Sequence, residues 1–491
     1  MNLSPEEFHP LTELAAEKAA EGLLCLETDG RILYANDAAA RTLAQTAAAL
    51  CERTIFQIAP EMNPALWQEL WKEIRRHASF AFEFALLAAE EKLIQVEVTV
   101  HHLKTDRREL ACVFFRDIEE RKRLQNLQQE FVSTASHELR TPMTVIREGV
   151  SQVLEGLRGD INDSQRRSLS IALSGIDRLG RIIDELLDIS KIESGKVTLR
   201  RERLDLATLA REVGAAFQSL ATDRGLDLRL TTPAGSLMIY GDHDRLVQVL
   251  TNLVNNSFKF TEKGHIQITV SAREGEAECS VSDTGMGLAP ADTEKIFNKF
   301  EQLGQVAVTG EKGTGLGLSI CRGIIGLHKG RIWAESSGTG TGMRVAFVIP
   351  RQTGRDVFRE QLAPMLRNVA RRGGSLSTVI FQIGNQESAP ATEAQIASVL
   401  SGLENLIRKH SGRRTDFLVK DIDAMYLALE SMVTREAARI ADRVVKAFDD
   451  SLAREGLSSK LHMTYTIMGF PDEGSDEGTY LDKICSQEAS S

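Results

Sequence analysis

The chain has 491 residues, of which 42% are hydrophobic and 26% are charged, and its formal net charge at pH 7 is −10. This length predicts three or four domains, each able to bury its own core, and the composition is that of soluble globular protein. The acidic balance, with no basic block to offset it, argues against nucleic acid as the main partner, and no apolar run approaches the roughly 20 residues of a membrane-spanning helix.

Residues 1–117 alternate short strand-like runs with one helical patch and form the first predicted domain. The predicted strands are 22–27, 32–35, 80–87, 93–103 and 110–118, and the predicted helix is 38–50. This order, with Gly30 followed by Ala35-Asn36 near its start, resembles a PAS sensor domain. The resemblance leaves two alternatives open, a bound ligand or a packed, ligand-free dimerising module, and no haem or flavin ligand stands out.

The next predicted domain, 118–199, consists of two long amphipathic helices. Leu124, Leu127 and Phe131 recur at three- and four-residue spacing, which predicts a coiled-coil entry helix. A turn at 159–164 precedes the second helix. Its predicted inward positions are Leu169, Leu173, Ile176, Leu179, Ile183, Leu186 and Ile189. Because an antiparallel helical hairpin is only half of a four-helix bundle, burying both apolar stripes predicts a second copy of the chain and hence a twofold homodimer.

One histidine of the first helix is distinguished by its position. The apolar residues of this turn are Phe131, Ala135 and Leu139. His137 lies about 200° around the helix from Ala135 and points to solvent. Glu138 follows directly, and Thr141 lies one turn later on the histidine's own face. An exposed imidazole beside a carboxylate can act as a nucleophile, but such a histidine is more often a solvated surface residue unless the chain supplies a group for it to attack.

Residues 200–350 are of mixed type and predict one domain, a sheet covered by helices. The predicted helices are 205–222, 242–260 and 315–328, and the predicted strands are 226–231, 265–272, 276–282, 330–335 and 343–349. On the second helix Asn252 and Asn256 are one turn apart, so both amides share a face. Amide oxygens suit a hard cation such as Mg²⁺, and Lys259 near the helix end can reach a phosphate.

Two glycine-bearing elements follow that helix. Asp283 places a carboxylate at a strand end beside Gly285 and Gly287, where the backbone can approach a planar ring. Three further glycines open the last helix: Gly313, Gly315 and Gly317. Small residues and free N–H groups at a helix start can bind phosphate. Each feature alone has an ordinary explanation as a loop or a solvent-facing pair, but their occurrence in this order within one domain favours a nucleotide site.

These motifs, together with Ser136-His137-Glu138-Leu139-Arg140-Thr141-Pro142 upstream, closely resemble the histidine protein kinases of two-component systems. The segment Phe297-Asn298-Lys299-Phe300 also matches the phenylalanine-bearing box of that family, and the resemblance covers about residues 120–350. It implies a phosphoacceptor domain followed by an α/β sandwich that binds ATP and Mg²⁺.

The resemblance also implies a role for each residue of the nucleotide site. Asp283 would accept a hydrogen bond from the adenine amino group. Asn256 would hold Mg²⁺ with Asn252 beside it, and Lys259 would contact the phosphates. The mobile lid is implied at 301–314, and Gly313, Gly315 and Gly317 would form its flexible edge.

The implied reaction is the attack of His137 on the γ-phosphoryl group of ATP, with Glu138 holding or taking the imidazole proton. No receiver domain is evident in the sequence, so the phosphoryl group would pass to an aspartate of a separate response regulator. Thr141 occupies the position where family members orient the water that dephosphorylates the regulator, although it can also be a plain helix threonine ahead of Pro142. Two rival functions are an enzyme whose main output is the phosphatase reaction and a nucleotide-responsive scaffold without transfer activity.

The tail begins with a helical linker, 351–372, and continues as a β-α-β-β-α-β series over 373–491, which predicts a ferredoxin-like fold. It weakly resembles the diguanylate cyclase (GGDEF) fold. Asp421-Ile422-Asp423-Ala424-Met425 stands in place of the signature Gly-Gly-Asp/Glu-Glu-Phe, and the first strand lacks the metal-binding aspartate. We therefore expect a degenerate domain with a binding or regulatory role and no cyclase activity.

The cysteines and the N-terminus bear on location. The six cysteines are Cys25, Cys51, Cys112, Cys279, Cys321 and Cys485. None forms a CxxC pair, which predicts free thiols in a reducing cytoplasm. The N-terminus carries acids and lacks an apolar core, so we expect no signal peptide and a cytoplasmic protein.

Overall fold

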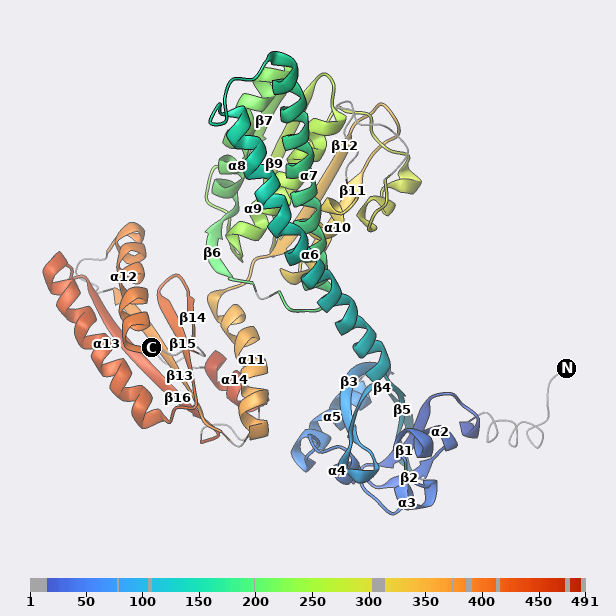
Figure 1. Cartoon of the computed structure of the whole chain (residues 1–491). Coiled ribbons are helices and arrows are strands. Elements are labelled where there is room, and N and C mark those ends of the chain that lie inside the picture. The colour runs from blue at the N-terminus through green and yellow to red at the C-terminus, as the bar shows by residue number, and fades with distance from the viewer. Residues whose placement is uncertain are drawn as a thin grey trace. The chain divides into compact units, whose positions relative to one another are not determined.

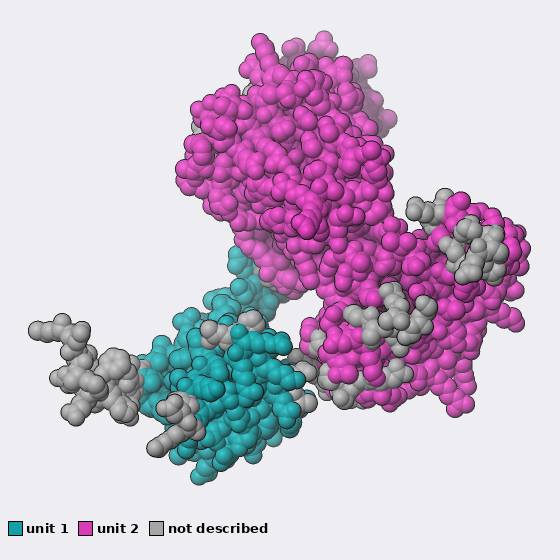
Figure 2. Space-filling model, turned by 180° about the vertical axis from the view of Figure 1, so that it is seen from behind, with its two compact units in different colours: residues 1–130 teal, residues 131–491 magenta. Residues whose placement is uncertain are grey.

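The computed structural model describes residues 16–76, 79–104, 108–197, 199–302, 314–372, 374–385, 391–411, 416–472 and 477–486. The chain divides into two compact units, Met1–Glu130 and Phe131–Ser491 (Figure 2). Figure 1 labels most of the elements used below. Among the helices in these ranges, none combines the length and the apolar content that crossing a membrane would require.

Unit 1 is built around a five-stranded antiparallel sheet with the strand order β2-β1-β5-β4-β3. Its strands are β1 (Gly22–Glu27), β2 (Ile32–Ala35), β3 (Ser79–Leu87), β4 (Leu93–Lys104) and β5 (Glu109–Asp117). Its helices are α2 (Asp37–Thr42), α3 (Ala47–Cys51), α4 (Ile55–Ile58), α5 (Pro64–Arg76) and the 3₁₀ turn η1 (Ala89–Glu91). All five predicted strands are confirmed within one residue at each end.

The helical part of unit 1 differs from the prediction. The single helix expected over 38–50 is two short helices, because Ala44 between them has a left-handed backbone (φ 51°) and Thr46 caps the start of α3. Helix α5 was not predicted at all. Its Trp67 and Trp71 are one turn apart and buried in the core of the unit, a helical spacing that the sequence did contain.

Asn36 joins the first elements of unit 1. Its side chain is fully buried and accepts hydrogen bonds from the backbone N–H groups of Leu23 (2.9 Å) and Ala39 (2.8 Å). Its amide group donates to the backbone oxygens of Ala16 and Glu21, both at 3.0 Å. One side chain therefore caps α2 and also fixes the start of β1.

The second predicted domain is a helical hairpin of α6 (Glu119–Leu154) and α7 (Asp163–Glu193). Helix α6 continues through Pro142, and α7 begins at an Asn162–Gln165 capping box. The ion pairs Arg140–Asp184 (2.7 Å) and Arg147–Asp177 (2.8 Å) join the two helices. Large apolar side chains of the hairpin remain exposed in the single chain: Phe131, Leu139, Val145, Ile146, Ile171 and Leu179.

Residues 202–350 form a sheet with the strand order β11-β12-β10-β9-β7, antiparallel except for the parallel pair β7 and β9. Its strands are β7 (Asp227–Thr231), β9 (His265–Arg273), β10 (Glu276–Asp283), β11 (Arg331–Glu335) and β12 (Met343–Pro350). Its helices are α8 (Leu206–Arg224), α9 (His243–Phe260), α10 (Gly317–Leu327) and the 3₁₀ turns η2 (Pro290–Asp292) and η3 (Lys295–Phe297). The predicted elements are all present, whereas the two-stranded sheet of β6 (Glu202–Asp205) and β8 (Met238–Gly241) was missed.

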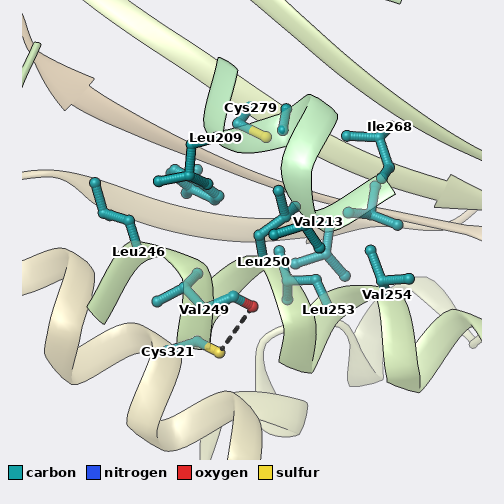
Figure 3. Packing of buried hydrophobic residues seen from close by; sticks show 14 of the residues in the cluster. Leu209, Val213, Leu246, Val249, Leu250, Leu253, Val254, Ile268, Cys279 and Cys321 are labelled. Atoms are coloured by element: carbon teal, nitrogen blue, oxygen red, sulfur yellow. Dashed lines mark hydrogen bonds between the residues drawn. The ribbon is translucent and has the colours of Figure 1, made fainter. Parts of the chain in front are cut away.

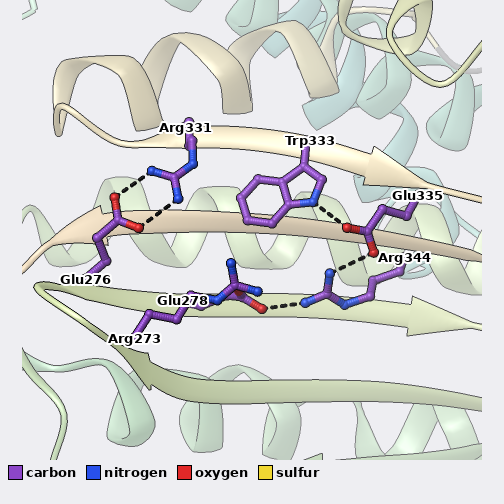
Figure 4. A network of polar contacts seen from close by, with 7 residues as sticks. All are labelled: Arg273, Glu276, Glu278, Arg331, Trp333, Glu335 and Arg344. Carbon is purple, nitrogen blue, oxygen red and sulfur yellow. Dashed lines mark hydrogen bonds and ion pairs between the residues drawn. The ribbon is translucent and has the colours of Figure 1, made fainter.

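This sheet has one apolar and one polar face. Helices α8, α9 and α10 share a single buried cluster with the apolar face, which Figure 3 shows around Leu250 and Val213. On the polar face the Trp333 indole donates to Glu335 (2.7 Å), and the Arg344 guanidinium donates to Glu335 at 3.0 Å (Figure 4). The helices therefore cover only the apolar side, and α9 is held there by its buried stripe.

The tail contains α11 (Gly354–Arg372) and a four-stranded antiparallel sheet with the order β14-β15-β13-β16. Its other elements are β13 (Leu376–Asn385), α12 (Glu393–Ser411), β14 (Phe417–Lys420), β15 (Ala424–Glu430), α13 (Thr434–Glu455), β16 (Leu461–Phe470) and α14 (Glu477–Ser486). The β-α-β-β-α-β order is as predicted, and α14 is an addition. The Tyr240 hydroxyl of β8 donates to the Lys420 carbonyl (2.8 Å) and to Asp421 (3.0 Å), so the tail contacts the mixed domain.

Replacing Asn36 by alanine tests its bridging role in unit 1. We expect Asn36→Ala to lower the stability of this unit by about 3 kcal/mol, because it removes a helix cap and leaves buried backbone groups without partners. Thr46→Ala, which removes one cap bond at the exposed start of α3, is the matched control and costs about 1 kcal/mol. Hydrogen exchange of segment 22–43 in the full chain measures both, and equal effects of the two changes would contradict the bridging role.

Candidate functional site

Helix α9 positions two of the predicted amides. Its buried residues keep one side on the sheet, and Asp242 caps its start by accepting from the Arg245 N–H (3.2 Å). Asn252 and Asn256 lie one turn apart and are both half-buried. The Asn252 side chain donates to the carbonyl oxygen of Gly317 (3.1 Å), which ties α9 to the first turn of α10. Two of the three sequence motifs are therefore in contact.

Asp283 lies at the end of β10 with its carboxylate held from three sides. One oxygen accepts from the Ser257 hydroxyl (3.0 Å), and the other accepts from the N–H groups of Gly285 (3.0 Å) and Met343 (3.3 Å). Burial raises the pKa of the Asp283 carboxyl above its usual range, and these hydrogen bonds act in the opposite direction. The result is an oriented acceptor with little access to water.

The glycines after Asp283 are required by close backbone approach. A Cβ atom on Gly285 would fall on the carbonyl oxygen of Phe260, and one on Gly287 would fall on that of Gly338. Gly287 also has a left-handed backbone (φ 60°). A hollow of about 500 Å³ opens beside this turn, and its lining includes Asp283, Ser336 and Met343.

The remaining nucleotide-site residues are placed unevenly. Gly315 has a left-handed backbone (φ 75°), and Gly317 opens α10, where an added Cβ would lie 3.0 Å from the Asn252 amide. The Lys259 ammonium lies 5.2 Å from the centre of the Phe260 ring. Gly313 and most of the predicted lid over 301–314 fall outside the described residues.

The three predicted residues of α6 are exposed. His137, Glu138 and Thr141 all face solvent in the single chain. The Thr141 hydroxyl donates to the backbone carbonyl of His137 (3.3 Å), which fixes its side chain one turn from the imidazole. Among the residues that the structure describes, no hydrogen bond joins the side chains of His137 and Glu138.

Helix α7 connects the histidine helix to the nucleotide motifs. The pairs Arg140–Asp184 and Arg147–Asp177 share one antiparallel register, so the His137 turn of α6 lies level with Leu187 of α7. At this level Asp188 accepts from the side chains of Arg245 (3.1 Å) and Gln248 (2.8 Å) of α9.

Two further contacts lie on either side of this level. Glu185 accepts a hydrogen bond from the hydroxyl of Thr314 (2.5 Å), which lies between Gly313 and Gly315. Glu193 pairs with Lys299 of the phenylalanine-bearing segment. The nucleotide domain therefore contacts α7 at the same level at which the His137 turn of α6 runs beside it.

The sequence reasoning missed Ser257 and the acidic residues of α7. Ser257 had a readable signal, because it is a hydroxyl at a position of α9 where the helical spacing demands an apolar residue. Glu185 and Asp188 gave none. Acidic residues are common on helix surfaces, and only the docked domain distinguishes these two.

Three protein-family models match the chain. A PAS domain matches residues 20–120, the His Kinase A (phospho-acceptor) domain matches 127–195, and the Histidine kinase-, DNA gyrase B-, and HSP90-like ATPase matches 241–353. The chain thus carries PAS, phosphoacceptor and ATPase domains in this order.

Curated relatives include the sensor protein SrrB of Staphylococcus aureus, with 32% identity over 233 residues, which are 47% of this chain and 40% of the relative. The virulence sensor protein BvgS of Bordetella bronchiseptica is 33% identical over 353 residues, which are 65% of this chain and 28% of the relative. The chain therefore spans less than half the length of either protein.

Solved structures are also similar. Full-length ShkA in complex with AMPPNP has 28% identity and a TM-score of 0.40, and the match covers 45% of each chain. The catalytic domain of histidine kinase ThkA has 34% identity and a TM-score of 0.28, covering 31% of this chain and 97% of that one.

The substitution Gly285→Ala tests the close approach at the Asp283 turn. We expect it to destabilise this domain by about 1–3 kcal/mol, because the backbone of Phe260 must move to admit a methyl group. Gly326→Ala in α10 meets no neighbour and should stabilise the chain by up to about 1 kcal/mol. Urea unfolding, followed by hydrogen exchange of β10, compares them. A Gly285→Ala protein as stable as Gly326→Ala would show that the turn has room for a side chain.

Proposed function

We propose that this chain, which carries PAS, phosphoacceptor and histidine-kinase-type ATPase domains, is a sensor histidine kinase. In this proposal His137 takes the γ-phosphoryl group of ATP and passes it to an aspartate of a separate response regulator. The observation that carries it is the docking of the nucleotide motifs on α7 at the level of His137, through Asp188 and Arg245. Transfer depends mainly on such positioning.

The nucleotide site fits ATP by the chemistry of its donors and acceptors. The Asp283 carboxylate, oriented by Ser257 and two backbone N–H groups, is our acceptor for the adenine amino group. Asn256 is our ligand for Mg²⁺, with Asn252 beside it, because amide oxygens suit this hard cation. When bound, Mg²⁺ supplies charge neutralisation at the phosphates, and we assign Lys259 the same task. We propose that Gly285 and Gly287 let the backbone approach the planar ring of the nucleotide closely. We propose that Gly313, Gly315 and Gly317 form the edge of the lid.

The acceptor reaction uses the neutral imidazole of His137. One ring nitrogen attacks the γ-phosphorus, an N–P bond forms, and the bond to the departing ADP oxygen breaks. The other ring nitrogen loses its proton, for which we assign Glu138 as the holder or acceptor. Exposure of both side chains leaves this group accessible to a nucleotide and to a partner in turn.

Two partners follow from the surface of the hairpin. The exposed apolar side chains of α6 and α7, with Phe131 at 73% and Ile171 at 74%, support a homodimer in which a second copy completes a four-helix bundle. The exposed face around His137 is the proposed dock for a response-regulator receiver domain. The phosphate-accepting aspartate of that receiver domain would have to reach the phosphorylated imidazole of His137.

A second activity is proposed for Thr141. Its hydroxyl is held by the His137 carbonyl and retains oxygen lone pairs that can orient a water molecule for dephosphorylation of the regulator. The rival scaffold function, with nucleotide binding but no transfer, is disfavoured because His137, Glu138 and Asn256 are all present. A cytoplasmic location remains a prediction.

We propose the domain limits 1–117, 118–199, 200–350, 351–372 and 373–491. The last domain is proposed to be ferredoxin-like, since its strand order β14-β15-β13-β16 and its β-α-β-β-α-β order are compatible with that fold. We propose that it is a degenerate GGDEF-like module without cyclase activity. Asp421, in the segment that replaces the signature, instead contacts Tyr240.

Labelling with γ-phosphate-labelled ATP tests the kinase proposal. We expect His137→Ala to abolish labelling while fluorescent ATP analogues still bind, because the acceptor is removed and the nucleotide site is not. Asn256→Asp should abolish both labelling and binding, because it changes the proposed metal ligand. Sedimentation should find dimers in both proteins. Undiminished labelling of His137→Ala would refute the proposed acceptor.

Dephosphorylation of the regulator tests Thr141. Thr141→Ala should leave autophosphorylation within about twofold and slow regulator dephosphorylation by about 100-fold, the lower end of the range for loss of one positioned catalytic group. Thr144→Ala is a matched control, because Thr144 makes the same type of bond to the Arg140 carbonyl (3.0 Å) one turn beyond the site. If both variants dephosphorylate the regulator at the wild-type rate, Thr141 is only a helix threonine.

A further inference from the structure

A row of reactive side chains crosses the sheet of unit 1. In the strand register Cys25 of β1 lies opposite Cys112 of β5, Tyr34 of β2 lies beyond Cys25, and His101 of β4 lies beyond Cys112. Because directly opposed residues of neighbouring strands project to the same face, the four side chains share one side of the sheet. The residues next to each cysteine along its strand belong to the core on the other side.

The two cysteines are close enough to be joined. Their sulfur atoms are 3.7 Å apart and are joined by an S–H···S hydrogen bond. Directly opposed residues in an antiparallel pair have Cα atoms about 4.5–5.5 Å apart, inside the roughly 4.4–6.8 Å range of disulfides. Small rotations of the two side chains therefore suffice for a bond, and the strands need not move.

Packing alone does not explain this pair. Cys279 and Cys321 are fully buried and act as apolar core residues, whereas Cys25 and Cys112 are half-buried on the face away from the core. In the part of the chain that the structure describes, no group of three His, Cys, Asp or Glu side chains is arranged to hold a metal ion. The two residues are both partly exposed, and their sulfur atoms lie next to each other.

We propose that Cys25 and Cys112 form a redox-active dithiol site that exchanges with low-molecular-weight disulfides and closes to a reversible cross-strand disulfide. The ligand class is a small disulfide such as oxidised glutathione. Partial exposure places the bond among the labile disulfides rather than the buried structural ones. This site is independent of the nucleotide chemistry proposed above.

The two thiols take different roles in the exchange. Either sulfur can donate in this contact, and the hydrogen bond with Cys25 lowers the pKa of the Cys112 thiol to about 7 although burial acts against this. The Cys112 thiolate attacks one sulfur of the small disulfide, and one thiolate leaves. Cys25 then loses its proton to solvent and attacks the Cys112 sulfur, releasing the second small thiol. Two protein thiols become one disulfide, and both electrons reduce the small disulfide.

The test is incubation of the full chain with oxidised glutathione, alkylation of the remaining thiols, and peptide mass spectrometry. We expect a linked peptide pair containing Cys25 and Cys112, which dithiothreitol reverses. In Cys25→Ser the exchange should stop at a glutathione adduct on Cys112 that lasts at least about tenfold longer than in the wild type, because the neighbouring thiol that resolves it is gone.

Cys51→Ser is the matched control, since Cys51 is exposed and has no partner thiol among the described residues. The peptide pair that links Cys25 to Cys112 should form in this variant as in the wild type. Cys25→Ala should repeat the result of Cys25→Ser, and circular dichroism checks that both fold. The proposal is overturned if oxidised glutathione modifies Cys51 but leaves Cys25 and Cys112 alkylatable. It is also overturned if wild-type Cys112 keeps its adduct as long as Cys25→Ser does.

Discussion

The arrangement of unit 2 depends on the contact between α7 and the nucleotide domain. Asp188 binds Arg245 and Gln248 at the start of α9, and Ile189 and Ile192 of α7 pack against the core of that domain. The ion pair is only partly shielded from water, so its Coulombic contribution is modest and the apolar contact supplies most of the adhesion. Such a contact fixes the position of the domain yet remains breakable.

The sequence predicted those parts of the site that lie within single elements. Asn252, Asn256 and Asp283 were predicted as candidates because a helical turn and a strand end place them without knowledge of the fold. Asp188 was not predicted, since its partners come from a different helix, and Ser257 was missed although a hydroxyl at an apolar position of α9 was readable. The same limit applies to unit 1. The antiparallel strands were readable from the alternation of apolar and polar residues. The break of the predicted helix at Ala44 was not, because a left-handed backbone occurs there without a glycine to indicate it.

The tail contacts the segment that connects the hairpin to the nucleotide domain. Glu360 of α11 pairs with Arg201 (3.0 Å) and Lys329 (3.0 Å), and Arg201 also donates to the Leu327 carbonyl at the end of α10 (2.6 Å). The Arg201 side chain is only 9% exposed, so losing its carboxylate partner would leave a poorly hydrated charge. The tail thereby stabilises the connection between α7 and α8. This structural role does not require a cyclase signature.

The first turns of α6 are also held by a buried apolar residue and an ion pair. Only Ile118, which is buried, separates β5 from α6, and Lys122 in the first turns of α6 binds Glu83 of β3 (2.6 Å). The helix then runs through Pro142 and carries His137. Within unit 1 the start of α6 is therefore fixed by a buried residue and an ion pair, as α7 is fixed within unit 2 by apolar contacts and the Asp188–Arg245 pair.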